Sequence, residues 1–180
     1  MKILAFAASS SSKSINKQLV SYASRLLANA ELANTETELL DINDYELPLF
    51  SEDKEAELGQ PERAKAFLDK IGQSDAIIIA FAEHNGSYTA AYKNLVDWAS
   101  RIQPKVFQNK PMVMLATSPG PGGASSVLAT ATSSAPFFDG EVKASLSIPD
   151  FYENFDSKQC AIINDKIQAQ LQTAINSLII

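Results

Sequence analysis

Apolar segments typical of buried strands alternate strictly with amphipathic helical segments along this 180-residue chain. The clearest strand, residues 76–81 (AIIIAF), is apolar on both faces, as expected for a central strand of a parallel sheet. Strict alternation predicts a parallel sheet with helices on both faces. We predict strands at 3–7, 37–42, 76–81, 111–116 and 142–148, and helices at 16–32, 61–71, 90–101, 156–178 and in a small-residue segment ending near 134.

Two segments carry more specific expectations. Ser14 precedes a helix whose apolar residues, Ala30 among them, recur at three-four spacing, so we expect it to be the N-cap. Residues 41–59 are predicted to be an irregular acidic loop. Its apolar residues Leu47, Leu49 and Phe50 either contact a second copy of the chain or pack on the chain's own sheet.

The composition sets broad limits on function. Apolar residues make up 46% of the chain and charged residues 20%, which is ordinary for a globular protein. The net charge of −6 argues against nucleic acid and an anionic membrane surface as partners. The single cysteine, Cys160, fits a reducing compartment, and no apolar run is long enough for a membrane span. We therefore expect one domain, residues 1–180, in the cytoplasm.

Three polar or glycine-rich loops follow predicted strands, at residues 9–14, 83–88 and 118–126. Ligands of parallel α/β sheets bind beyond the carboxyl ends of the strands. The first loop, serine-rich and followed by a helix, has the donors of an anion site, although a solvated, capped turn is the alternative. It matches neither the dinucleotide G-x-G-x-x-G pattern nor the phosphate-binding G-x-x-x-x-G-K-[ST] pattern.

The other two loops suggest a turn and a close approach to a ligand. Asn85-Gly86 predicts a tight turn directly after the central strand. His84 is the only histidine, so a multi-histidine metal site is excluded, and a structural role for it is the alternative to catalysis. Trp98 is expected in the core or a subunit interface. The glycines of the third loop would let its backbone approach a flat ligand closely.

Familiar catalytic constellations are missing. The chain has one histidine and one cysteine, and it lacks G-x-S-x-G, H-E-x-x-H and C-x-x-C motifs. We therefore predict no catalytic side chain and no metal site. If the protein is an enzyme, a cofactor supplies the chemistry.

Taken together, the loops resemble the NAD(P)H-dependent FMN reductases of the flavodoxin-like superfamily, which include azoreductases, quinone reductases and chromate reductases. Their first loop reads G-S-x-R-x-x-S-x-N, and here Ser9, Ser14 and Asn16 match it, while Ala8 and Ser11 replace the Gly and Arg. Their P-E-Y-N-G-S motif and K-N-x-x-D-W helix are matched by residues 82–87 (AEHNGS) and 93–98 (KNLVDW). Residues 118–123 (SPGPGG) match a third, glycine-rich loop.

The resemblance implies a flavodoxin-like three-layer sandwich with strand order 2-1-3-4-5 and hydride transfer from NAD(P)H to FMN. The first loop would hold the FMN phosphate, with Ser9, Ser14 and Asn16 contributing side chains. The second loop would lie at the isoalloxazine edge, and the third would line its other side. The implied cofactor-binding residues are Ser9, Ser11, Lys13, Ser14, Ile15, Asn16, Ala82, Glu83, His84, Asn85, Gly86, Ser87, Tyr88, Ser118, Pro119, Gly120 and Gly123.

Ser11 stands where the family has an arginine, and this predicts weaker, more exchangeable FMN binding. Lys13 is the candidate to supply the missing charge. The implied acceptor is a small molecule: a quinone, an azo compound, a metal oxyanion or free flavin. The resemblance also implies a homodimer or homotetramer. The alternatives are a flavodoxin-type electron carrier and a flavin-free binding or sensor relative.

Overall fold

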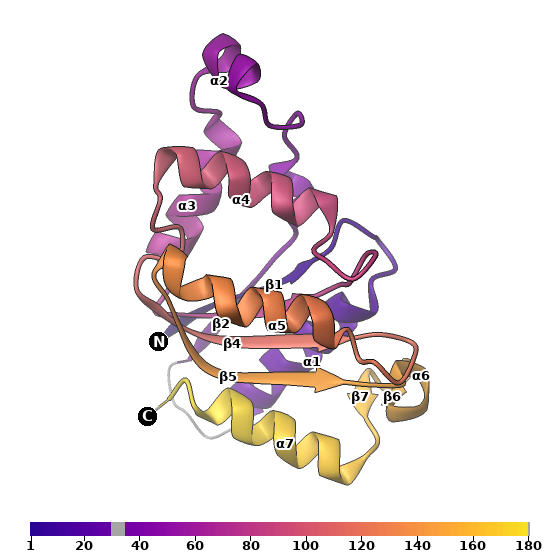
Figure 1. The fold of residues 1–180 in the computed structure, drawn as a ribbon. Coiled ribbons are helices and arrows are strands. Elements are labelled where there is room, and N and C mark those ends of the chain that lie inside the picture. The colour runs from indigo at the N-terminus through magenta and orange to yellow at the C-terminus, as the bar shows by residue number, and fades with distance from the viewer. Residues whose placement is uncertain (30–34, 180) are drawn as a thin grey trace.

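A computed structural model describes residues 1–29 and 35–179 of the chain. Five parallel strands form one sheet in the order β2-β1-β3-β4-β5 (Figure 1). The expected strand order and the central position of β3 are confirmed. The strands are β1 (Lys2–Ala8), β2 (Glu36–Leu40), β3 (Ala76–Phe81), β4 (Lys110–Thr117) and β5 (Gly140–Ile148), with a two-stranded hairpin of β6 (Phe155–Asp156) and β7 (Ala161–Ile162).

Helices cover both faces of the sheet, so the fold is the flavodoxin-like α/β sandwich that the sequence suggested (Figure 1). The helices are α1 (Ile15–Asn29), α2 (Glu52–Leu58), α3 (Glu62–Gly72), α4 (Ala90–Ile102), α5 (Ser125–Ser134), α6 (Phe151–Asn154) and α7 (Asp165–Asn176), with 3-10 turns η1 (Ile42–Tyr45) and η2 (Ala135–Phe138). Residues 30–32 of the first predicted helix, including Ala30, lie outside the described residues.

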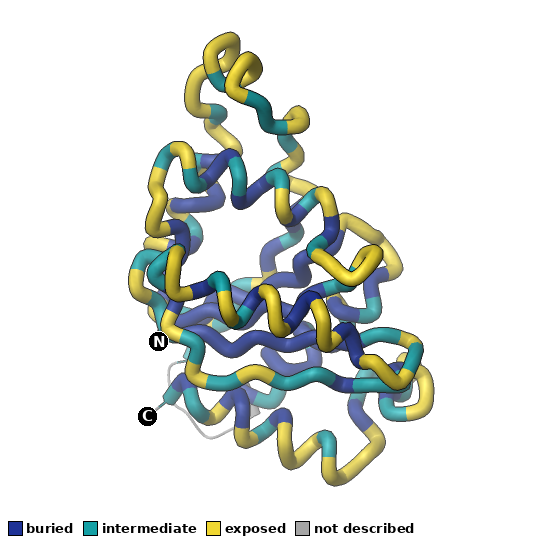
Figure 2. Tube along the Cα trace, in the orientation of Figure 1, coloured by how far each residue is buried: buried dark blue, intermediate teal, exposed yellow. Residues whose placement is uncertain are grey.

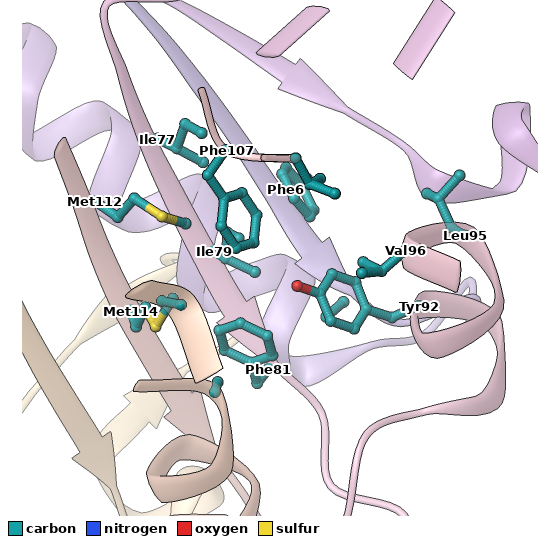
Figure 3. Packing of buried hydrophobic residues seen from close by; sticks show 14 of the residues in the cluster. Phe6, Ile77, Ile79, Phe81, Tyr92, Leu95, Val96, Phe107, Met112 and Met114 are labelled. Atoms are coloured by element: carbon teal, nitrogen blue, oxygen red, sulfur yellow. The ribbon is translucent and has the colours of Figure 1, made fainter. Parts of the chain in front are cut away.

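The alternation of side chains along β3 divides the core between the two faces. Ile77, Ile79 and Phe81 pack with the apolar residues of α3, α4 and α5, whereas Ala76, Ile78 and Ala80 pack with those of α1 and α7. All six residues of β3 have no exposed surface. Figure 2 shows β4 buried and the edge strand β5 only partly buried, and Figure 3 shows the cluster on the α4 side. No described helix combines the length and apolarity of a membrane span.

Two predicted boundaries are wrong. The acidic segment 41–59 is not irregular throughout, because it contains η1 and α2. Asp41 and Ser51 cap these helices with side chains that accept hydrogen bonds from Asn43 N and Lys54 N. These local caps satisfy the first N–H groups of each helix and so favour its start.

The C-terminal helix begins at Asp165, not near residue 156. The Asp156 carboxylate accepts hydrogen bonds from the N–H groups of Lys158 and Gln159, which turns the chain into the β6–β7 hairpin. Asn164 then caps α7 by accepting from Lys166 N and Ile167 N. Side chains that bond to nearby backbone groups in this way compete with helix continuation.

Candidate functional site

A cavity of about 260 Å³ lies at the carboxyl ends of β1, β3 and β4, where the three predicted loops meet. It is open and lined mainly by neutral polar groups. Of the predicted site residues, it is lined by Ser9, Ser11, Lys13, Ser14, Ile15, Asn16, Ala82, Glu83, His84, Ser118 and Pro119. The predicted residues Asn85, Gly86, Ser87, Tyr88, Gly120 and Gly123 do not line it, whereas Thr117 and Tyr152, which were not predicted, do.

The first loop has unused donors, two of them on residues that line this cavity, Ile15 and Asn16. Ser14 caps α1 as expected, with its hydroxyl accepting from Lys17 N at 3.3 Å. The backbone N–H groups of Ser12, Ile15 and Asn16 make no hydrogen bond within the described part of the chain. Such N–H groups at a helix start carry partial positive charge and bind anions. The loop is therefore built as an anion cradle as well as a capped turn.

Asn16 has a structural task that sequence reasoning did not find. Its side-chain amide donates to Thr117 O at 3.1 Å and accepts from Thr117 N at 3.0 Å. This two-way bond joins the start of α1 to the end of β4, and Asn16 is 2% exposed. One amide N–H and the backbone N–H of Asn16 remain for a ligand.

Thr89 makes a second such link, again missed from the sequence. Its hydroxyl donates to Ala8 O at 3.0 Å and accepts from Tyr92 N at 3.3 Å, so it caps α4 and ties it to the end of β1. A threonine directly before a helical pattern is an N-cap signal. The sequence therefore contained a signal for the N-cap, but none for the hydrogen bond to β1. Together with Asn16, Thr89 fixes the first loop against its neighbours.

The second loop is a two-residue hairpin at the end of β3. His84 and Ser87 exchange backbone hydrogen bonds of 2.9 and 3.1 Å around Asn85 and Gly86, both with positive φ (52° and 74°). This is the geometry for which Asn-Gly is preferred, and it confirms the predicted turn. The hairpin tip is exposed.

Glu83, beside that hairpin, caps the N-terminal end of α5. Its carboxylate accepts from Val127 N at 2.9 Å. Ala124, the residue at the N-cap position of α5, makes no side-chain capping bond. A carboxylate at a helix start is stabilised by the free N–H groups and the helix dipole. Glu83 therefore holds the second and third loops together at the cavity.

The third loop is packed against the segment after β5. The N–H groups of Asp150 and Phe151 donate to the carbonyls of Gly120 and Ser118, both at 3.1 Å. This places Tyr152, 67% exposed, at the cavity wall. No signal in the local sequence indicated it, because its position depends on these backbone bonds to a distant loop.

The glycines of the third loop serve different purposes. Gly123 has a φ of +57°, and a Cβ there would lie 2.3 Å from Ser147 Oγ and 3.0 Å from Pro149 N. It therefore packs closely against β5 and the segment that follows, and its expected contact with a ligand stays a prediction. Gly120 and Gly122 have open space where a Cβ would stand.

No charged pair or metal-ligand cluster dominates the cavity. The described residues hold no group of three or more His, Cys, Asp or Glu side chains arranged to bind a metal. Lys13 is the only Lys or Arg among the residues lining the cavity, and its side chain makes no ion pair within the described part of the chain. The site therefore offers hydroxyls, backbone N–H groups and one cation.

Comparison with known proteins shows which family the chain belongs to. The family described as NADPH-dependent FMN reductase matches residues 1–145. An NAD(P)H-dependent FMN reductase of Pseudomonas aeruginosa is 32% identical over 143 residues, covering 78% of this chain and 75% of that protein. An NADPH:quinone oxidoreductase of Arabidopsis thaliana is 37% identical over 97 residues, 54% of this chain; the match spans about half (48%) of that relative's length.

A solved structure of a flavoenzyme has a similar fold. The flavoenzyme NAD(P)H:(acceptor) oxidoreductase of Paracoccus denitrificans superposes with a TM-score of 0.76 at 26% identity, covering 99% of this chain and 94% of that one. The family match covers the three loops and the five strands of the sheet up to the middle of β5. This chain belongs to the NADPH-dependent FMN reductase family.

Proposed function

We propose that this chain is an FMN-dependent NAD(P)H oxidoreductase. The observation that carries the proposal is the cavity at the ends of β1, β3 and β4, which presents free N–H groups and hydroxyls in a member of an FMN reductase family. FMN, when bound, supplies the redox chemistry, taking electrons from a nicotinamide and passing them to an acceptor. This chemistry needs no catalytic acid or base from the protein.

The donor set fits a phosphate at the first loop. Ser9 and Ser14 are 7% and 8% exposed, and each hydroxyl remains able to donate while accepting a backbone bond. With the N–H groups of Ser12, Ile15 and Asn16 they give five neutral donors. Each such bond contributes roughly 0.5–1.5 kcal/mol net. We propose that these groups bind the FMN phosphate.

The other two loops are proposed to contact the ring system of the flavin. Ala82, Glu83 and His84 line one wall of the cavity, and Ser118 and Pro119 line another. The open space at Gly120 supports a close approach of the ligand on that side. Asn85, Gly86, Ser87 and Tyr88 are proposed as contacts through the adjoining exposed hairpin. Gly123, which packs against β5, is proposed as a contact through its backbone.

A quinone is the acceptor class that the relatives favour. Several proteins similar to this chain are named quinone reductases, and a fold relative is an azoreductase. Azo compounds, metal oxyanions and free flavin are therefore further acceptors to screen. NADH and NADPH are compared in the same assay.

The experiment that tests the proposed function begins with the colour of the purified protein. We expect a flavin absorbance band, or its appearance on adding FMN, followed by NAD(P)H consumption with a quinone. FMN binding without nicotinamide oxidation would support the flavodoxin-type carrier instead. Absence of FMN binding at any concentration would support the flavin-free binding or sensor relative.

We also propose that the protein is a cytoplasmic, single-domain homodimer or homotetramer. Leu49 and Phe137 are both 79% exposed, and large exposed apolar side chains are common at subunit contacts. Within segment 41–59, Leu47 packs partly into the chain's own core and Phe50 lies against Trp98, so Leu49 is the side chain left for a partner. Light scattering of Leu49→Ser beside the natural protein measures this contribution.

A further inference from the structure

A second cavity, of about 240 Å³, lies between α4 and α5 above β3 and β4. It shares no lining residue with the cavity at the three loops. Its lining is mainly apolar: Phe81 and Met114 come from the sheet, Val96 from α4 and Ala131 from α5. Figure 3 shows Phe81 and Met114 beside each other on this side of the sheet.

One wall is an aromatic cluster. Phe81, Tyr88 and Tyr92 surround one another with ring centroids 5.3–5.9 Å apart. Phe81 and Tyr92 meet edge to face at 88°. Aromatic rings favour offset-stacked or edge-to-face contacts with further rings, so this wall is suited to a flat aromatic guest.

The cavity contains one polar group that the fold leaves without a partner. Tyr92 as a residue is 4% exposed, and its hydroxyl, which makes no hydrogen bond within the described part of the chain, is not one of the fully buried atoms left without a partner. Figure 3 shows this hydroxyl pointing inward, to the side where Phe81 and Met114 lie. Burial raises the pKa of Tyr92, so the group remains a donor at neutral pH. A hydroxyl that faces the cavity and has no acceptor in the protein is free to donate to a ligand there.

Polar side chains also line the cavity, and they are paired with one another. Tyr88 and Ser134 share a hydrogen bond of 2.9 Å between their hydroxyls, linking the second loop to α5. Lys93 and Asp97 form an ion pair on α4 at the same rim, so their charges are matched to each other. The paired charges leave no unmatched charge in the lining, which favours a neutral ligand.

We propose that this cavity binds a small planar aromatic carbonyl compound of one or two rings, whose oxygen accepts a hydrogen bond from Tyr92 Oη. An apolar cavity of about 150 Å³ already holds a benzene ring, so the volume here suits one ring or two fused rings. Apart from Tyr88, which is also a proposed flavin contact, the cavity shares no residue with the proposed flavin site, and the proposal does not depend on FMN binding.

The test uses two matched probes, 1-indanone and indane, which differ in the carbonyl oxygen. Binding to the natural protein is measured by titration calorimetry and ligand-observed NMR, with and without saturating FMN. We expect both probes to bind, 1-indanone more tightly by about three- to tenfold, and FMN not to compete. Competition by FMN, or equal affinity for both probes, would overturn the proposal.

Two substitutions locate the site. Tyr92→Phe should remove the advantage of 1-indanone and leave indane binding unchanged, and Ala131→Leu should abolish binding of both by filling the cavity. FMN affinity should stay at its natural value in both variants. If Ala131→Leu does not fold, Tyr92→Phe still tests the proposal. This variant should fold normally, because removal of an unpaired hydroxyl should not lower the melting temperature. Retention of the 1-indanone advantage in Tyr92→Phe contradicts the proposal.

Discussion

At the scale of single residues, Gly123 is a position where the fold has no room for a side chain. Gly123→Ala forces a Cβ to within 2.3 Å of Ser147 Oγ, at a φ of +57°. We expect a loss of about 1–3 kcal/mol in the free energy of unfolding, measured by urea denaturation. Gly122→Ala is the matched control, since open space surrounds that position, and its stability should change by less than about 0.5 kcal/mol. Equal effects of the two substitutions would disprove the requirement for glycine at position 123.

Lys13 is the residue on which cofactor affinity should depend through charge. The loop otherwise offers neutral donors, and Ser11 replaces the arginine of the family pattern. Lys13→Ala should weaken FMN binding by about tenfold at low ionic strength, and by less at high salt, because the contact is exposed and screened.

Calorimetry of the apo-protein with FMN measures the effect of Lys13→Ala. Lys143→Ala removes an equal charge from β5 and serves as the control. Nanomolar binding that persists in Lys13→Ala would eliminate Lys13 as the substitute for the arginine.

At the scale of elements, α4 holds the segment before α2 in place. Asn94 Oδ1 accepts from Phe50 N at 2.8 Å, while its amide nitrogen donates to Leu47 O and Pro48 O at 3.0 and 3.1 Å. Trp98 Nε1 adds a bond of 2.8 Å to Pro48 O. The segment therefore packs on its own chain, against a helix and not the sheet, while the exposed Leu49 leaves the expected subunit contact a prediction.

Asn94→Ala removes three of these bonds and should cost about 1–3 kcal/mol. Hydrogen exchange of the Phe50 amide should accelerate strongly, because that N–H loses its acceptor. Asn176→Ala, on the exposed side of α7, is the control and should change neither quantity appreciably. Unchanged exchange at Phe50 would show that Trp98 alone holds the segment.

The elements that the sequence predicts well are those with a local cause. Residues 76–81 are apolar on both faces and form the central strand. Asn85 and Gly86 favour the turn that they form, because both adopt positive φ. The missed features depend on contacts between distant parts of the chain. Asn16 meets Thr117 across 101 positions, and Gly123 is constrained by Ser147, 24 positions away. No periodicity within a window of a dozen residues reports such pairs.

At the scale of the whole molecule, Glu38 connects three elements at the edge of the sheet. Its carboxylate on β2 lies 2.6 Å from Lys70 Nζ of α3 and 3.2 Å from Lys2 Nζ of β1. The hydrogen bond from Lys70, with that from Lys2 and their charges, holds the pKa of Glu38 below its ordinary value of 4.5, against the opposing effect of burial. These contacts favour the folded state only while the carboxylate is ionised.

The sign of the pH dependence follows from that shift. Because the pKa is lower in the folded state, the stabilisation is fully present above pH 4.5 and is lost as the pH falls through the folded-state value. Glu38→Gln should therefore lower the melting temperature at pH 7 by about 1–3 °C, the size expected for a partly exposed ion-pair network. The difference from the natural protein should shrink steadily below pH 4.5.

Melting curves of both proteins between neutral and acid pH measure this convergence. Glu153→Gln, at an exposed glutamate outside the ion pairs of the described residues, should follow the natural protein throughout. A Glu38→Gln deficit that stays constant into acid would mean that the side chain acts through packing and not through its charge. Added salt separates the two causes independently, because screening weakens the charge contacts at pH 7 and leaves packing unchanged.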